Sequence, residues 1–269
     1  MENVLTIAGS DSLAGGGLQA DLKTFEELDT FGLSAVTSLV TILPQQVHVT
    51  PVANTVLAQQ LTSILTQVSI RAAKTGLLGG VDAIHTVATQ LAVTPMILVV
   101  DPVFVFKEGR TDRQTTELEQ MKRDLLPLAT VVTPNLAEAE LLSGDTLTRA
   151  EQLPGAAQKI QALGCPNVVI KGGNRLPGNQ AVDYLLTPQG EFWFRTLKVA
   201  TPATNGAGCT FSAAITAWLA RGVSVEEAVQ RAKTFVRAGI AYGVRFNSTT
   251  GSVWQGAWRQ HGGQQRGQS

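Results

Sequence analysis

The chain has 269 residues, 44% of them hydrophobic and 26 of them glycine, a length that suits one large α/β unit. Lysine plus arginine and aspartate plus glutamate both number 21, so the formal net charge is zero, and no basic stripe favours a nucleic acid or a membrane surface as a partner. The first residues lack the long apolar segment of a secretory signal, and every apolar run is too short to span a membrane. The two cysteines stand far apart, which does not suit a disulfide framework. We therefore expect a cytoplasmic protein.

Short apolar runs rich in β-branched residues alternate with helix-like segments through the first two thirds of the chain. Strands are expected at 3–9, 33–43, 96–103, 129–135 and 166–173. Helices are expected at 18–28, 55–68, 83–92, 115–128 and 156–164. The strands are almost continuously apolar, which suits a sheet that helices cover on both faces. The alternation predicts a mostly parallel sheet with right-handed crossovers.

The pattern changes after Gly173. Two alternating runs, 181–187 and 190–199, flank the turn "TPQG" and predict a hairpin at the edge of the sheet. A helical third follows from 209 to about 243. Because no linker or repeat interrupts the chain, we expect a single domain over 1–258 and a disordered Gly/Gln-rich tail over 259–269.

Polar residues and glycines gather where the predicted parallel strands end, which is where such sheets bind ligands. In the first of these loops, Gly15, Gly17 and Ala20 satisfy the dinucleotide fingerprint G-x-G-x-x-G/A. The second strand ends in "VTILP" without the acidic residue that this fingerprint requires, which disfavours a dinucleotide oxidoreductase. No Gly-Lys-Ser/Thr triplet occurs, so a Walker P-loop is excluded. Close strand–helix packing explains the glycines but leaves Asp11, just past the first strand, unexplained.

Three further polar residues follow predicted strands, and each has two interpretations. Asp101 precedes a proline that stops its strand, so it is either a turn residue or a carboxylate facing a metal–phosphate complex. Asn135 and Glu138 stand at i and i+3, which suits either a capping box or oxygen ligands for Mg²⁺. Lys171 ends the run "NVVIKGG" and either meets an anion or emerges at the surface.

Cys209 stands where a glycine turn, Gly206-Ala207-Gly208, opens an apolar helix. The unpaired amides of a helix N-terminus form an anion hole, and that position lowers the pKa of a thiol. The alternative is a buried cysteine that packs as a small apolar side chain. The two glycines favour the functional interpretation because they let the backbone approach a ligand closely. Cys165 is interpreted as a packing residue.

Taken together, these loops resemble the ribokinase-like superfamily. Within it, the chain is similar to the branch that hydroxymethylpyrimidine (phosphate) kinases share with cysteine-type pyridoxal kinases. The resemblance covers nearly the whole chain and rests on "TIAGSDSLAGGGLQADLKTF", "AAKTGLLGG", "VVDPV", "LLPLATVVTPNLAEAELL", "VVIKGG", "AVDYLL" and "GAGCTFSAAITAWLARG", in that order. It implies a three-layer α/β fold, a homodimer, and ATP and Mg²⁺ as the cosubstrate and the metal.

The same resemblance implies roles for individual residues. Cys209 would act as the general base, and the amides of Gly206, Ala207 and Gly208 would hold the transferring phosphoryl group. Mg²⁺ would be held by Asp101, Asn135 and Glu138. ATP would be bound by Asn135, Lys171, Asp183, Thr204, Gly206, Gly208, Lys233 and Val236. The substrate would be bound by Asp11, Gly17, Ile42, Gly76 and Phe106.

The chain departs from the family pattern in its first loop, where Ala14 begins a run that usually reads Gly-Gly-Ala-Gly. Asn205 stands where histidine is common, and Phe106 replaces the lid cysteine of cysteine-type pyridoxal kinases, which puts a two-cysteine mechanism in doubt. Ile42 stands where pyrimidine kinases carry a glutamine that reads the amino group of the ring.

An aliphatic Ile42 cannot make that hydrogen bond, so we expect phosphorylation of the 5′-hydroxymethyl group of pyridoxal, pyridoxine or pyridoxamine. Hydroxymethylpyrimidine (phosphate) kinase activity is the alternative within the same chemistry. A nucleotide-sensing domain without catalysis stays open as a different class of function.

Overall fold

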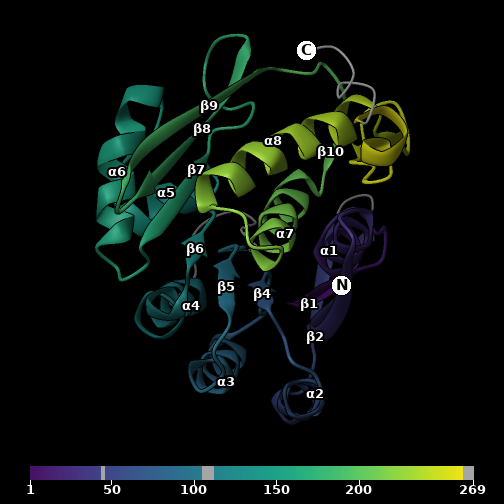
Figure 1. Cartoon of the computed structure of the whole chain (residues 1–269), viewed down its shortest axis with the longest axis vertical. Helices are drawn as coiled ribbons and strands as arrows, with labels where there is room; N and C mark the ends of the chain where they lie inside the picture. The colour runs from purple at the N-terminus through teal and green to yellow at the C-terminus, as the bar shows by residue number, and fades with distance from the viewer. Residues whose placement is uncertain (44–45, 105–111, 263–269) are drawn as a thin grey trace.

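A computed structural model of the chain describes residues 1–43, 46–104 and 112–262. Within these residues the main sheet has nine strands in the order β3-β2-β1-β4-β5-β6-β7-β8-β9 (Figure 1). Their bounds are β1 Glu2–Asp11, β2 Thr30–Leu43, β3 Gln46–Pro51, β4 Ala72–Thr75, β5 Ile97–Val100, β6 Val131–Val132, β7 Asn167–Lys171, β8 Gln180–Thr187 and β9 Gly190–Leu197. Neighbours from β2 to β7 pair in parallel, whereas β3, β8 and β9 pair antiparallel. The predicted parallel sheet and its edge hairpin, β8–β9, are confirmed.

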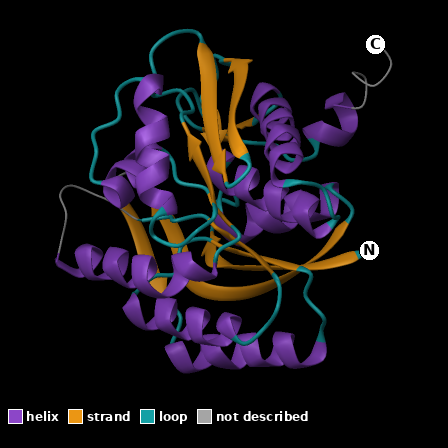
Figure 2. Ribbon diagram, turned by 60° about the vertical axis from the view of Figure 1, so that its left-hand side comes forward, coloured by secondary structure: helices purple, strands orange, loops and turns teal. Residues whose placement is uncertain are grey.

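Helices cover both faces of this sheet, which confirms the three-layer α/β fold (Figure 2). One layer contains α2 Asn54–Gln67, α3 Val81–Ala92, α4 Asp112–Gln120, α5 Leu136–Ser143 and α6 Leu153–Gln161. Helical turns over 121–128 continue α4. The other layer contains α1 Gly17–Glu27, α7 Ala207–Ala220 and α8 Val225–Ala241. The predicted C-terminal helical third is therefore two helices. No described helix is long and apolar enough to cross a membrane.

The two-residue period of the strands places the polar residues of the site. Successive side chains point to opposite faces of a sheet, so residues two apart share a face. The face under α7 is apolar along the central strands, with Val4, Ala72, Val99, Val131 and Val169 in its core. Two residues later each strand places a polar residue on that same face: Thr6, Lys74, Asp101, Thr133 and Lys171. Each strand therefore changes from apolar to polar as it approaches the N-terminus of α7.

A second, three-stranded sheet was not predicted from the sequence. It consists of β10 Ala203–Asn205, β12 Gly251–Ser252 and β11 Val244–Arg245, in the order β10-β12-β11. The Ser252 hydroxyl lies 3.1 Å from the Asn205 carbonyl oxygen and 3.4 Å from that of Gly15. The small sheet thus joins the first loop to the residues that lead into α7.

The last described residues of the chain lie against α1. Trp258–Gly262 forms a helical turn, and the Arg259 guanidinium lies 3.2 Å from a Glu27 carboxylate oxygen. This turn packs back on the α1 side of the domain, and the disorder expected over 259–269 stays a prediction. Residues 263–269 lie outside the described part of the chain.

Candidate active site

The N-terminus of α7 is shaped by a left-handed glycine. Gly206 is the N-cap, with φ +80°, and no side chain caps the helix. A Cβ atom at this position would lie 1.6 Å from the carbonyl oxygen of Gly15, so only glycine fits. The helix begins at Ala207, two residues earlier than expected, so Gly208 and Cys209 lie in its first turn. The amides of that turn have no partner within the helix and are available to an anion.

Lys171 and Asp101 meet beside this helix end. The Lys171 ammonium lies 2.7 Å from one Asp101 carboxylate oxygen, and Ser212 of α7 donates to the other at 2.9 Å. Thr133 adds a 3.3 Å hydrogen bond to the first oxygen. A Cβ atom at Gly208 would lie 3.4 Å from the Lys171 ammonium, which places that charge at the first turn of α7. Lys171 therefore does not extend into solvent, and Asp101 is not a simple turn residue.

Asn135 and Glu138 form the capping box that the sequence allowed. The Glu138 amide donates to the Asn135 side chain at 3.1 Å, and the Asn135 amide donates to Glu138 Oε2 at 2.8 Å. Glu138 is buried, and burial raises the pKa of its carboxyl to about 7, although Lys171 acts in the opposite direction. The cap uses Oε2, and no hydrogen bond to Oε1 is found in the described part of the chain.

These oxygens fit Mg²⁺, though not as a cation cage made of protein alone. Asp101 and Glu138 bring two buried carboxyl groups toward the single ammonium of Lys171. Among the described residues there is no cluster of three or more side chains of the metal-binding types. Mg²⁺ commonly takes one or two protein carboxylates and completes its octahedron with water and phosphate oxygens. The donor set therefore suits Mg²⁺ that arrives with a nucleotide.

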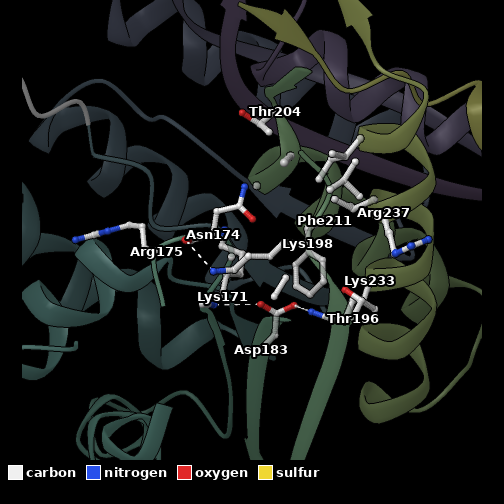
Figure 3. A pocket seen from close by; sticks show the side chains of 18 of the residues that line it. Lys171, Asn174, Arg175, Asp183, Thr196, Lys198, Thr204, Phe211, Lys233 and Arg237 are labelled. Atoms are coloured by element: carbon white, nitrogen blue, oxygen red, sulfur yellow. Dashed lines mark hydrogen bonds and ion pairs between the residues drawn. The ribbon is translucent and has the colours of Figure 1, made fainter. Parts of the chain in front are cut away.

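A pocket of about 330 Å³ opens beside the α7 N-terminus, where Lys171 lies (Figure 3). Its lining includes most of the residues expected to bind ATP: Asn135, Lys171, Asp183, Thr204, Gly208, Lys233 and Val236. Gly206 does not line it but precedes Ala207, which does. Inside the pocket the Lys233 ammonium lies 2.6 Å from one Asp183 carboxylate oxygen, and the Gly172 amide donates to the other at 3.1 Å.

Sequence reasoning missed several residues that line this pocket, among them Lys198, Phe211 and Arg237. Figure 3 shows these side chains around the same space as Lys171 and Asp183. Lys198 donates to the carbonyl oxygens of Asn174 and Leu176, which ties the end of β9 to the loop after β7. Phe211 could have been found, because it stands four residues after Ala207 on the same helix face. No local pattern marks Lys198, whose role depends on the pairing of β8 with β9.

The first loop is built around Asp11. Its carboxylate accepts hydrogen bonds from the amides of Leu13, Gly15 and Gly16, at 2.9, 3.2 and 2.8 Å. Asp11 therefore shapes this loop, and its contact with a substrate ring stays a prediction. Gly17, with φ +57°, is required because a Cβ atom there would lie 2.2 Å from the Gly9 carbonyl oxygen. The substrate-binding role of Gly17 also stays a prediction.

Cys209 lies against this loop. A Cβ atom at Gly16 would lie 3.7 Å from the Cys209 sulfur and equally far from the Asp11 carboxylate. The expectation of a lowered thiol pKa is wrong for this structure. Although part of the residue is exposed, its thiol is enclosed, and burial raises the pKa to about 11. The Lys74 ammonium and the Gly17 amide act in the opposite direction without offsetting burial.

Two of the remaining predicted substrate residues are described, one just after β4 and one near the end of β2. A Cβ atom at Gly76 would lie 3.0 Å from the Ala8 Cβ and 3.4 Å from the Lys74 ammonium, so Gly76 packs tightly on the same face of the sheet. Ile42 lies near the end of β2 with 36% of its surface exposed, and its amide reaches the Ser12 hydroxyl at 3.4 Å. Phe106 lies outside the described residues, so its predicted role is untested.

Comparison with known proteins gives two kinds of relative. A pyridoxine kinase of Bacillus subtilis is 40% identical over 264 residues, which cover 96% of this chain and 97% of the relative. A hydroxymethylpyrimidine/phosphomethylpyrimidine kinase of Haemophilus influenzae is 39% identical over 249 residues, covering 90% and 92%. The structure of the Staphylococcus aureus pyridoxal kinase in complex with AMP-PCP and pyridoxal superposes with a TM-score of 0.91 at 41% identity, covering 97% of this chain and 96% of that one.

The profile of the phosphomethylpyrimidine kinase family matches residues 11–254, from the Asp11 loop to just past the small second sheet. The match thus includes every loop that contributes to the site described above. On this evidence, the chain belongs to the phosphomethylpyrimidine kinase family.

Proposed function

We propose that the protein is an ATP-dependent kinase that phosphorylates the 5′-hydroxymethyl group of a B6 vitamer. The observation that carries this proposal is the position of Cys209, in the first turn of α7 between the pocket at Lys171 and the glycine loop at Asp11. A nucleotide on one side and a small alcohol on the other would both meet the free amides of that turn. Pyridoxal and an ATP analogue are the ligands named for the Staphylococcus aureus relative.

The chemistry follows from this arrangement. The substrate hydroxyl oxygen attacks the γ-phosphorus, the bond from that phosphorus to the β,γ-bridging oxygen breaks, and ADP leaves. The hydroxyl proton passes to the Cys209 thiolate. The amides of Gly206, Ala207 and Gly208, as the resemblance implies, stabilise the negative charge on the transferred group. The Cys209 amide, in the same first turn, and the Lys171 ammonium add to this stabilisation. Mg²⁺ held by Glu138 and Asp101, with Asn135 nearby, would supply further charge neutralisation at the phosphates.

The pocket at Asp183 and Lys233 suits the nucleoside part of ATP. Phe211 and Val236 give it apolar walls, while Lys198 and Arg237 add positive charge. Such a mixture of apolar walls and a few placed polar groups is typical of small-molecule sites. Thr204 lies at the end of the pocket that leads to the α7 N-terminus.

Hydroxymethylpyrimidine kinase activity is the second candidate, and the 39% identity to the Haemophilus influenzae relative favours it. The two candidates differ in the ring that the enzyme accepts. The aliphatic Ile42 favours the pyridine ring, because an amino group against that wall would lose its hydrogen bonds to water without replacement.

The test is an ATP-dependent phosphorylation assay with pyridoxal, pyridoxine, pyridoxamine, hydroxymethylpyrimidine and its phosphate, with products identified by mass spectrometry. We expect the highest kcat/KM with a B6 vitamer. A preference for hydroxymethylpyrimidine would give the function to the second candidate. ATP binding without any product would point to a nucleotide sensor.

Cys209→Ala tests the proposed base. We expect kcat to fall by about 10²- to 10⁴-fold, the range usual for a general base, with little change in ATP affinity. Cys165→Ala is the matched control, because Cys165 is the other cysteine and lies buried before β7. Near-normal turnover in Cys209→Ala would refute the assignment.

The assembly and location of the protein are part of the same proposal. We infer a homodimer and a cytoplasmic enzyme, with residues 1–258 acting as one kinase domain. Support comes from the family resemblance and from the continuous core that joins strands of the N-terminal half to α7 and α8. Light scattering on the purified protein tests the dimer, and a monomeric mass would refute it.

A further inference from the structure

One wall of the pocket beside the α7 N-terminus is an exposed loop. The β7–β8 loop, residues 173–179, contributes its first three residues to the lining of that pocket. Every residue of the loop except Leu176 is exposed. Gly173 and Gly178 have φ of +53° and +91°, and nothing lies within 4 Å of the positions that their Cβ atoms would take. Such a segment has many conformations open to it, so the structure must hold it if the pocket is to keep its shape.

Lys198, just past the end of β9, supplies the contacts that hold this loop. Its ammonium donates to the carbonyl oxygens of Asn174 and Leu176, at 3.2 and 2.5 Å, and its backbone amide donates to the carbonyl oxygen of Asn179 at 2.9 Å. Figure 3 draws the contact with Asn174. No other residue outside the loop is hydrogen-bonded to it in the part of the chain that the structure describes. A single residue therefore binds the loop at three points.

Three lysines line the pocket, and their ammonium groups have different partners. Lys171 pairs with Asp101 at 2.7 Å, and Lys233 pairs with Asp183 at 2.6 Å. Among the described residues, no ion pair is found for Lys198, although it lines the same space. The charge of Lys198 therefore acts on the carbonyl groups of the loop and not on a carboxylate.

The start of the loop is fixed without the Lys198 side chain. The Gly172 amide donates to the Val182 carbonyl oxygen at 3.0 Å and to an Asp183 carboxylate oxygen at 3.1 Å. A Cβ atom at Gly172 would lie 2.2 Å from that Val182 oxygen, so the chain lies directly against β8 there. Lys171, one residue earlier, is held by Asp101. Loss of the Lys198 ammonium would therefore release the middle of the loop and leave the phosphate-facing end of the pocket in place.

We propose that Lys198 is a positioning residue for ATP, which holds the β7–β8 loop as a preformed wall so that the nucleotide binds without first having to order that loop. The inference rests on the proposed function, which assigns this pocket to ATP. Lys198 acts through the backbone of the loop, and its role thus differs from that of Lys171, which faces the phosphates. It determines nucleotide affinity and not the chemical step.

Removing the ammonium should weaken nucleotide binding more than it slows the chemistry. A hydrogen bond to a charged group changes the ratio of two states by about ten- to a hundredfold. The apparent Kd rises by the factor by which the fraction of protein with an ordered loop falls. Lys198→Met keeps the length of the side chain without a donor, so Kd for ADP and KM for ATP should rise by about tenfold. The change in kcat should be much smaller, because Lys171 and the first turn of α7 stay in place.

The release of the loop can be measured without any ligand. Arg175 is exposed and precedes Leu176, whose side chain is buried and whose carbonyl oxygen accepts from Lys198. Trypsin can cleave the bond between these two residues only when the loop leaves its place, so the rate of cleavage follows the released fraction. The rate is measured by peptide mass spectrometry on the folded full chain, and it should rise by about tenfold in Lys198→Met.

Two further variants serve as controls. Lys198→Arg keeps a positive charge and several donors, so it should restore most of the nucleotide affinity and most of the protection at Arg175. Lys159→Met is the matched control, because Lys159 lies on α6 outside the pocket and forms an ion pair with Asp145 at the surface. It should match the wild type in both measurements. Calorimetry gives Kd for ADP, and thermal unfolding shows that each variant is folded.

Faster cleavage at Arg175 together with weaker ADP binding in Lys198→Met, and neither in Lys159→Met, would support the proposal. Weaker binding with an unchanged cleavage rate would mean that Lys198 touches the nucleotide directly, and it would overturn the proposal, as would unchanged binding. If Lys198→Met does not fold, Lys198→Gln, with a shorter polar side chain, is judged by the same results. A wild type that does not bind ADP would refute this inference and the proposed function together. A wild type that binds ADP but phosphorylates no B6 vitamer would refute the proposed function alone.

Discussion

Replacing Gly206 with alanine should damage catalysis more than stability. Gly206 has φ +80°, a conformation that costs a residue with a Cβ about 1–2 kcal/mol. The new Cβ would also lie 1.6 Å from the Gly15 carbonyl oxygen, whereas contacts below 3.0 Å are essentially never seen. The backbone at Gly206 and the backbone at Gly15 must therefore move apart by about 1.4 Å. The first of these segments leads into the anion hole, and the second belongs to the first loop.

Gly144→Ala is the matched control for this experiment. Gly144 ends α5 with φ +77°, and nothing lies within 4 Å of the position that its Cβ would take. It therefore has the same backbone cost without the collision. We expect Gly144→Ala to lower Tm by about 2–8 °C, which corresponds to about 1–2 kcal/mol for a chain of this size, and to leave kcat unchanged.

Gly206→Ala should lower Tm further and reduce kcat by about 10²-fold, because a misplacement of about 1 Å in a catalytic group has effects of that size. KM for ATP should change only a few-fold, since the pocket walls at Asp183 and Lys233 stay in place. Steady-state kinetics and thermal unfolding of the wild type and both variants are the assays. If Gly206→Ala matches Gly144→Ala in both Tm and kcat, the interlocking of the first loop with α7 does not control the chemistry.

Two further residues give predictions of different kinds. Burial raises the pKa of Glu138 from 4.5 to about 7, so the folded protein holds a proton that the unfolded chain releases, and wild-type stability should fall between about pH 4.5 and 7. In urea unfolding without Mg²⁺, Glu138→Gln should flatten the dependence of stability on pH in this range. The variant should also need a higher Mg²⁺ concentration for turnover. If the wild type and the variant give identical curves of turnover against Mg²⁺ concentration, the residue serves only as a cap. Ile42→Gln should narrow the preference for pyridoxal over hydroxymethylpyrimidine by about ten- to a hundred-fold, since an unpaired buried polar group costs about 1–3 kcal/mol. An unchanged ratio of the two kcat/KM values would show that this side chain does not read the ring.

The layers of the fold could be predicted because local patterns encode them. The central strands are apolar on both faces, and that composition is visible without any long-range information. The capping box of Asn135 and Glu138 was equally accessible, since it depends on two residues three apart. The strands of the small sheet were not, because β10, β11 and β12 have only two or three residues each and show no period.

The electrostatics of the site could not be read from local patterns. Position at a helix N-terminus predicts a lowered pKa for Cys209, but burial by the first loop, almost 200 residues earlier in the chain, raises it instead. Lys171 and Asp101 were each singled out, yet their pairing depends on two strands that lie on opposite sides of β6. Lys74 did have a signal, since a lysine inside the buried run "AAKT" needs an anion, but nothing local identifies Asp21 as that anion.

The order in which the layers appear during synthesis follows from the place of α7 in the chain. The sheet face that it covers is contributed by Val4, Ala72, Val99, Val131 and Val169. All of these residues are made before α7 begins at Ala207, and α7 is itself buried at every position from Thr210 to Ala220. At about 5–20 residues per second, synthesis leaves that apolar face without its covering helix for about 2–8 seconds after the last of these strands. A nascent chain that stops short of α7 would therefore present a sheet face that only α1 covers in part, and it would be a substrate for chaperones or for aggregation and not a smaller working enzyme.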